Sequence, residues 1–367
     1  MKRQIGVLIS VGIFFIYGLG FLSGYIVWVS PFGKQVDALY SKNYLGQVIS
    51  GKSKKKKSLA YLDPQKAYVE MDNYVWGVPH IMTPFVNYGS RPGKYRAATI
   101  NSMQFRSSRE LITPKPKNSF RIFLTGGSTA FGSGSPSNEQ TIGGYLESNL
   151  NNKNPNSDIE FEVFTMAVPA WTTTHERIII ENRLSEMDPD LIISFSGLND
   201  VHWGFLGANI QWFSANNVFI NITNIALGFF GKDPMPDVMD KVLERIDCDQ
   251  VSYRLKKNIE IIHYTVSKKN INYIFTLQPN ISVTGKKLHP MEKSHDEKNI
   301  MKGVKPYFRN CYNKIDENLR NMKASNFQYV NLTKIFNSNP EDEVIFLDCC
   351  HFGDRGNKII AANIYNS

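Results

Sequence analysis

Short apolar segments alternate with longer segments of helical length from residue 118 to the carboxyl terminus of this 367-residue chain. Strands are predicted at 120–124, 159–164, 191–195, 273–277 and 329–332. Helices are predicted at 142–150, 173–187, 251–267, 304–324 and 356–365. This alternation predicts an α/β fold whose central parallel sheet is covered by helices on both faces, with right-handed crossovers.

The first of these strands leads into a glycine turn, Thr125-Gly-Gly-Ser128, and a helix is predicted further on. Ser128 therefore stands at the carboxyl end of a parallel strand, where open α/β sheets build their sites. The turn lacks the Gly-Lys-Ser/Thr ending of a P-loop and the spacing of a dinucleotide fingerprint. Alone, Gly-Gly-Ser is a weak signal, and later segments add to it.

A carboxylate and an imidazole stand three positions apart near the carboxyl terminus, as Asp348 and His351. In a loop or a first helical turn, this spacing puts the two side chains side by side. The carboxylate can then hold the imidazole in one tautomer and leave its other nitrogen free to take a proton from a serine hydroxyl.

The predicted strand at 191–195 is followed by Gly197-x-Asn199-Asp200. An asparagine at a strand end can aim its amide hydrogens at an oxyanion that develops during a reaction. Asn199 is therefore a candidate for stabilising a negative charge.

Together these segments resemble the SGNH (GDSL-like) hydrolase superfamily over residues 118–367. Ser128 matches the nucleophile block, Asn199 the Gly-x-Asn-Asp block, and Asp348 with His351 the Asp-x-x-His block, in the family's order. The resemblance implies a flavodoxin-like three-layer α/β/α domain. It also implies ester hydrolysis without a metal or other cofactor.

The chain departs from the family in its second block, which aligns with residues 165–172. Ala170 stands where the family has a glycine whose N–H joins the oxyanion hole. Alanine keeps this donor, so the hole survives if the backbone angles suit a Cβ. The first block is also Gly-Gly-Ser-Thr rather than Gly-Asp-Ser.

The resemblance implies a role for each matching residue. Ser128 attacks the ester carbonyl, His351 acts as general base and then as general acid, and Asp348 orients His351. The oxyanion hole consists of the N–H groups of Ser128 and Ala170 and the side chain of Asn199.

A run of 25 residues without charge, Ile5–Val29, precedes this domain. As a helix it would span about 37 Å, enough to cross a bilayer. No small-x-small cleavage site follows it, so residues 1–30 are predicted to form an uncleaved transmembrane anchor. The positive-inside rule is indecisive here. The short basic head, Lys2 and Arg3, favours a cytoplasmic amino terminus and an exported catalytic domain.

Two further regions are less regular. Residues 31–117 contain many prolines and aromatic residues, and are predicted to form a membrane-proximal segment that packs on the catalytic domain. Residues 207–247 interrupt the alternation as an insertion. An inserted helix, a lid over the site and a membrane-resting face all fit its apolar part, Val218–Phe230. The polar segment Lys286–Lys305 is predicted to be a surface loop.

The formal net charge of +9 owes much to a run of lysines, Lys52 and Lys54–Lys57. A solvated linker and a contact with anionic lipid head groups both fit this run. It has no interleaved aromatic residues of the kind that would indicate nucleic-acid binding.

Four cysteines fit an oxidising compartment without requiring one. The adjacent Cys349 and Cys350 are not expected to bridge to each other, because neighbouring residues make a strained ring. The chain contains no Cys-x-x-Cys spacing, so no zinc site is predicted. His289, His295 and Asp296 fit a solvated loop better than a metal site.

Membrane-anchored relatives in the resembled family often act on acylated cell-envelope polysaccharides. The leading hypothesis is therefore an exported, membrane-anchored esterase that removes acyl groups, chiefly acetyl, from such a glycan. An O-acyltransferase would use the same residues. A third hypothesis is a non-catalytic glycan-binding or assembly protein on this fold. The sequence predicts no oligomeric state.

Overall fold

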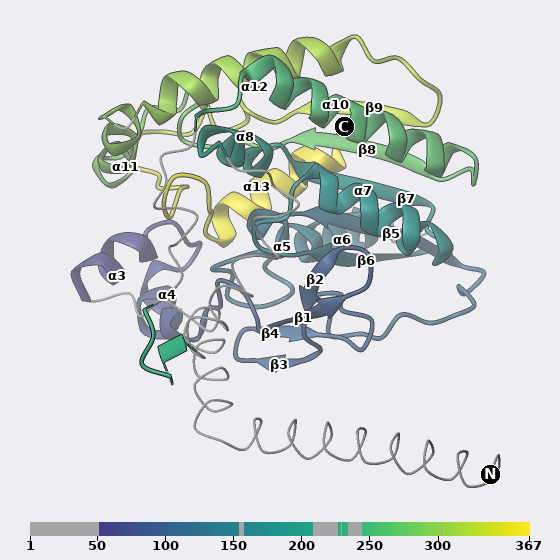
Figure 1. The fold of residues 1–367 in the computed structure, drawn as a ribbon. Coiled ribbons are helices and arrows are strands. Elements are labelled where there is room, and N and C mark those ends of the chain that lie inside the picture. Colours follow the sequence, from purple (N-terminus) through teal and green to yellow (C-terminus); the bar gives the residue numbers. More distant parts are fainter. Residues whose placement is uncertain (1–50, 154–157, 208–226, 229, 234–243, 302) are drawn as a thin grey trace, which may run out of the picture.

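The computed structural model describes residues 51–153, 158–207, 227–228, 230–233, 244–301 and 303–367 (Figure 1). At its centre lies a five-stranded parallel sheet in the order β6-β5-β7-β8-β9. The strands are β5 (Ser119–Gly126), β6 (Glu160–Ala167), β7 (Leu191–Ser196), β8 (Asn272–Leu277) and β9 (Phe327–Asn331). Numbered along the sheet-forming part of the chain, this is 2-1-3-4-5, the order of flavodoxin-like doubly wound sheets.

Helices cover both faces of this sheet. One face carries α7 (Thr173–Asn182), α10 (Cys248–Ser267) and α12 (Val304–Arg320), and the other carries α6 (Ile142–Lys153) and α13 (Asp354–Tyr365). Successive side chains of β5 point to opposite faces of the sheet. Phe123 belongs to the hydrophobic core on the α10 face, with Ile259, and Leu124 belongs to the core on the α13 face, with Ile360. The predicted parallel sheet with flanking helices is confirmed.

All five predicted strands are present within three residues of their expected ends, because a sheet buried on both faces requires nearly continuous apolar runs. The five predicted helices are present too, although α12 ends at Arg320. The helix predicted at 173–187 is α7 followed by a 3-10 turn, Leu184–Glu186. Within the described part of residues 118–367, three further helices were not predicted: α5 (Ser128–Phe131), α8 (Leu198–Phe205) and α11 (Pro290–Met301).

The prediction of a surface loop at Lys286–Lys305 is wrong, because α11 occupies most of it. Lys286 and Glu292 form a fully buried ion pair at 3.0 Å. The Glu292 carboxylate also accepts hydrogen bonds from the backbone N–H groups of Ile345 and Phe346, at 2.9 and 3.0 Å. Two of the polar residues that suggested a loop thus form a buried pair, because a buried charge has to be paired and hydrogen-bonded to be tolerated.

The described part of the segment before the sheet, residues 51–117, combines short helices and strands with irregular stretches. It contains α3 (Gly51–Ser58), α4 (Pro64–Glu70), the 3-10 turn Met71–Asn73, and two antiparallel pairs, β1 (His80–Thr83) with β2 (Asn87–Ser90) and β3 (Gly93–Tyr95) with β4 (Ala98–Ile100). It contacts the sheet domain directly: Tyr61 donates to the carbonyl of Gly134 at 2.7 Å, and the N–H of Leu62 donates to Asp354 at 2.8 Å.

Within the residues that the structure describes, no helix is both long and apolar enough to cross a bilayer. The anchor predicted at residues 1–30 lies outside the described part of the chain, as does most of the insertion predicted at 207–247. The lysine run, Lys52 and Lys54–Lys57, lies in α3 (Gly51–Ser58), where Lys54 pairs with Asp72 at 2.7 Å.

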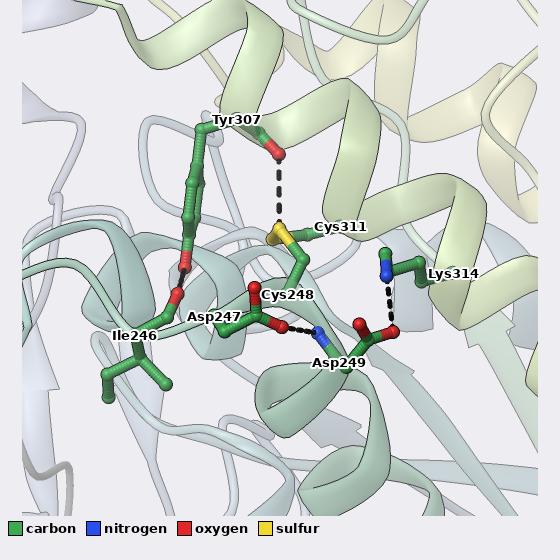
Figure 2. Close-up of a disulfide and its surroundings, with 7 residues drawn as sticks. All are labelled: Ile246, Asp247, Cys248, Asp249, Tyr307, Cys311 and Lys314. Carbon is green, nitrogen blue, oxygen red and sulfur yellow. Dashed lines mark hydrogen bonds and ion pairs between the residues drawn. A yellow bond between two sulfur atoms is a disulfide. The ribbon is translucent and has the colours of Figure 1, made fainter.

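A disulfide joins two helices of the sheet domain. Cys248 is the first residue of α10, and Cys311 lies within α12, 63 positions later (Figure 2). Tyr307, one turn before Cys311, donates its hydroxyl to the carbonyl of Ile246 at 2.5 Å. The bridge and this hydrogen bond therefore hold the start of α10 against α12.

A buried arginine connects the first segment to the loop that follows Ser128. One amino group of Arg106 donates to the carbonyls of Phe131 and Gly132, both at 2.8 Å, and the other donates to Ala97. Arg106 is 4% exposed, and burial lowers its pKa to about 9. The planar fork of a guanidinium can serve several carbonyls at once, which an ammonium group cannot.

Replacing Arg106 by lysine should lower the free energy of unfolding by about 3 kcal/mol, since two or more buried carbonyls lose their donors. Urea denaturation followed by circular dichroism measures this change. Arg320, whose side chain is 70% exposed, offers a matched control: Arg320→Lys should change stability by less than about 0.5 kcal/mol. Equal stabilities of the two variants would contradict this role for Arg106.

Candidate active site

Ser128 follows the carboxyl end of β5, as the first residue of the short helix α5. The two glycines before it leave no room for a side chain. A Cβ on Gly126, whose φ is +149°, would lie 2.4 Å from the carbonyl oxygen of Phe195, and one on Gly127 would lie 2.3 Å from the amide nitrogen of Asn199. The turn can therefore bring the backbone of Ser128 close to Asn199 only with glycine at these positions.

The side chains of Ser128, His351 and Asp348 form a continuous chain of hydrogen bonds. Nε2 of His351 lies 2.8 Å from Oγ of Ser128, and Nδ1 of His351 lies 2.8 Å from Oδ2 of Asp348. The structure thus brings together three residues predicted from two motifs that lie far apart in the sequence. In this order a serine hydroxyl can pass its proton to the imidazole while the carboxylate orients the ring.

Asp348 is held as a carboxylate. Burial alone would raise the pKa of Asp348, but the charge and hydrogen bond of His351 and the backbone N–H groups of His351 and Cys350 together hold it below its usual value. An ionised Asp348 accepts the Nδ1–H of His351. Nε2 is then left as the acceptor for the Ser128 hydroxyl, which is the tautomer a general base needs.

Ala170 occupies a left-handed backbone position, with φ of +71°. The N–H of Trp171 donates to the carbonyl of Val168 at 3.1 Å, which closes a turn with Pro169 and Ala170 at its centre. Because proline cannot adopt a positive φ, this is a type II turn, whose third position usually holds glycine. The alanine therefore takes the backbone conformation of the glycine it replaces, at a cost of about 1–2 kcal/mol.

Asn199 is hydrogen-bonded to this turn. Its amide nitrogen donates to the carbonyl of Trp171 at 2.7 Å, which uses one of its two hydrogens. Ser128, Ala170 and Asn199 line one hollow together with His351. The arrangement places the three predicted oxyanion donors at the same cavity as the predicted nucleophile and base.

Asp200, the last residue of the Gly-x-Asn-Asp segment, serves the scaffold. Its carboxylate accepts the N–H of Thr173 at 3.1 Å and the Thr173 hydroxyl at 2.6 Å, at the start of α7. Burial raises the pKa of Asp200 to about 6. This contact fixes the segment between Ala170 and α7.

Sequence reasoning missed the contribution of the first segment to the site. The Trp76 ring lies edge-on to the His351 imidazole, with centroids 5.1 Å apart. Backbone contacts hold it there: Gly134 donates its N–H to Val75 at 2.9 Å, and the Ser133 hydroxyl donates to the Trp76 carbonyl. The aromatic residues of this segment indicated packing on the domain, but no local pattern marked Trp76 as the neighbour of His351.

The cysteines beside His351 were also not assigned to the site. Cys349 and Cys350 are unbridged, with sulfurs 3.5 Å apart, and both line the hollow. Among the described residues, the one compact group of potential metal ligands is Asp348, Cys350 and His351, within 4.8 Å of one another. In that group Nδ1 of His351 is already engaged by the carboxylate of Asp348.

Among the known proteins compared, only solved structures resemble this chain. A scan against protein-family models finds no match, and a search of curated proteins finds none either. Solved structures do match. An acetyl xylan esterase is 16% identical, with 67% of this chain and 98% of that chain covered and a TM-score of 0.39. An acetylxylan esterase from Geobacillus stearothermophilus is 15% identical, with 67% and 93% covered and a TM-score of 0.39.

A GDSL-like lipase from Bacteroides thetaiotaomicron is 12% identical, with 70% of this chain and 90% of that chain covered and a TM-score of 0.38.

A buried histidine packs beside the type II turn that contains Ala170. His175 caps α7, where its Nδ1 accepts the N–H of Thr172 at 3.2 Å, and its ring stacks on Trp171. Burial lowers the pKa of His175 from 6.5 to about 4. The folded protein therefore favours the neutral imidazole, whose Nδ1 lone pair is the cap.

This capping histidine should make the fold sensitive to acid. Between pH 6.5 and pH 4 the unfolded chain binds a proton at His175 that the folded chain does not. The stabilisation is complete above pH 6.5 and falls by about 3 kcal/mol as pH drops to 4. Glutamine at this position can keep the capping box without titrating. We expect His175→Gln to lose less stability than wild type over this range in urea denaturation.

The difference in the pH dependence of unfolding free energy between wild type and His175→Gln reports on His175 alone. Asp200 acts with the opposite sign, losing stability as pH rises from 3.8 to about 6, but it does so in both proteins and cancels. The near-ultraviolet circular dichroism of His175→Gln at pH 7 serves as the control for folding. Parallel stability curves for wild type and variant would rule out the assignment.

Proposed function

We propose that this protein is a serine ester hydrolase of the SGNH type, with Ser128 as nucleophile. The observation that carries the proposal is the hydrogen-bonded chain from Ser128 through His351 to Asp348, with both contacts at 2.8 Å. The three oxyanion donors around the same hollow support it. A protein that only binds a glycan would not need a serine hydroxyl held against a histidine in this way.

The reaction proceeds through an acyl-enzyme. Nε2 of His351 takes the proton of the Ser128 hydroxyl as Oγ bonds to the ester carbonyl carbon. The N–H groups of Ser128 and Ala170 and the amide of Asn199 hold the negative oxygen. When the intermediate collapses, the alcohol leaves with the proton from His351, and the acyl group stays on Ser128. Water, activated by His351, then releases the acid and restores the serine.

For the substrate we propose an acyl ester of a cell-envelope polysaccharide or related glycan. Two features support this choice: the family resemblance of the four motifs, and the uncharged run Ile5–Val29, which would hold the enzyme at a membrane. Acyl transfer to a sugar hydroxyl would use the same acyl-enzyme. The two reactions differ only in whether water or the sugar attacks it.

A fluorophosphonate probe should label wild type, whereas Ser128→Ala and His351→Ala should not be labelled, because the probe needs an activated serine. Hydrolysis of an activated ester should fall by about 10⁴-fold or more in both variants. Ser148, exposed on α6, gives the matched control, and Ser148→Ala should react like wild type. Undiminished labelling of Ser128→Ala would exclude Ser128 as the nucleophile.

Adding a candidate glycan to the same reaction separates hydrolysis from transfer. We expect free acid as the main product, detected by chromatography. Acylated glycan as the main product, lost in Ser128→Ala, would establish transfer and retain the same catalytic residues.

We also propose that residues 1–30 anchor the protein as a single span, with the catalytic domain on the exported side. The disulfide between Cys248 and Cys311 supports this orientation, because structural disulfides persist in oxidising compartments. The short basic head before an uncharged run is typical of an export signal.

A reporter enzyme that works only outside the cytoplasm should be active when fused after Ser367. Placing two lysines in the span, Ile13→Lys with Ile16→Lys, should abolish this activity, because each charge opposes insertion by about 3 kcal/mol. In the wild-type fusion, Cys248 and Cys311 should react with maleimide only after reduction. Activity of a cytoplasmic reporter alone at Ser367 would refute the proposed topology.

A further inference from the structure

The hollow beside Ser128 has a volume of about 500 Å³. One part of its wall consists of Ser128, Asn199 and His351, so it adjoins the point where an ester carbonyl would sit. Much of the remaining wall is apolar, with large side chains from α8 and α12. These residues are Leu198, Trp203 and Phe205 on α8, Leu206 directly after it, and Val304 and Phe308 on α12.

The positions of these residues along the two helices direct their side chains into the hollow. Val304 and Phe308 stand four positions apart on α12 and so share one face of the helix. On α8, Trp203 packs with Ala170 and Leu206. Trp203 and Phe308 are only 8% and 5% exposed, so their rings are held by the surrounding core. The apolar wall is therefore built into the fold.

A disulfide and hydrogen bonds fix the positions of α8 and α12 relative to each other. On α12, Tyr307 donates to the Ile246 carbonyl, and Cys311 is bridged to Cys248 (Figure 2). The N–H of Ile246 in turn donates to the carbonyl of Gly204 on α8, at 2.9 Å. The space between α8 and α12 is thus kept at a set width.

We infer that this hollow binds the acyl group of the ester, and that the preferred acyl group is a longer apolar chain than acetyl. The inference rests on the proposed ester hydrolysis at Ser128. The wall also contains the polar residues His202, Asn280 and Ser282. A sugar, which forms the alcohol part, would still leave hydroxyl groups unsatisfied where Leu206 and Phe308 line the hollow. The methyl of an acetyl group is about the size of a water molecule, roughly 30 Å³, and would fill little of the space.

The preference can be measured with p-nitrophenyl acetate, butyrate, hexanoate and octanoate, which share one leaving group. Each methylene buried against an apolar wall is worth about 0.8 kcal/mol, so kcat/KM should rise about threefold to fourfold for each one until the hollow is full. Val304→Trp narrows the hollow and should move the optimum to a shorter chain. Val69→Trp, at a position 72% exposed, is the matched control and should keep the wild-type optimum.

A second measurement does not depend on turnover. Cys349 is an exposed thiol in the wall of the hollow. The measurement uses the Cys350→Ser variant, in which Ser128 carries an alkylphosphonate adduct. A long-chain adduct should slow the reaction of Cys349 with maleimide at least tenfold relative to a methylphosphonate adduct. This readout also covers the case in which Val304→Trp fails to fold.

Each other outcome counts against the inference in a distinct way. An optimum at acetate in wild type overturns the acyl-length inference but leaves ester hydrolysis intact. A rate that rises with the alkyl chain of the alcohol, in a series from methyl to hexyl acetate, and not with the acyl chain would assign the hollow to the alcohol. If no ester is turned over and Ser128 is not labelled by a fluorophosphonate, the proposed function fails and the inference fails with it.

Discussion

The hydrogen bond between His351 and Ser128 joins residues 223 positions apart, and its chemistry depends on holding both partners still. The backbone around each residue fixes its position. Ser128 follows a turn whose glycines allow no side chain. His351 lies in a loop that is closed by a hydrogen bond from the N–H of Leu347 to the carbonyl of His351, at 2.8 Å. Preorganised groups of this kind need little rearrangement as charge develops in a reaction.

Buried charges away from the reacting atoms maintain this geometry. Glu292 accepts the backbone N–H groups of Ile345 and Phe346, three residues and two residues before Asp348. Arg106 binds the carbonyls at the end of α5, the helix that Ser128 begins. Charges that are buried and fully hydrogen-bonded add little net stability, but removing a single partner is expensive. They therefore act here mainly as constraints on where two loops can lie.

Ala170 departs from the pattern of the family that the sequence resembles, but this departure need not alter the proposed chemistry. The donor in question is a backbone N–H, which every residue except proline possesses. Substituting glycine by alanine changes the cost of the left-handed conformation, and leaves the direction of the N–H unaltered. The contacts of the turn with Asn199 and Trp203 hold Ala170 in that conformation.

The sequence by itself determined the strands, the main helices and the order of the chemical motifs, because apolar periodicity and turn residues are local signals. It also singled out Ser128, Asn199, Asp348 and His351 by residue type and spacing. Only the tertiary structure decided that α11 is a helix around a buried ion pair, that Trp76 lies against His351 and that Cys248 pairs with Cys311. Each of these depends on residues brought together from distant parts of the chain, and pairing of that kind leaves no trace in a local pattern.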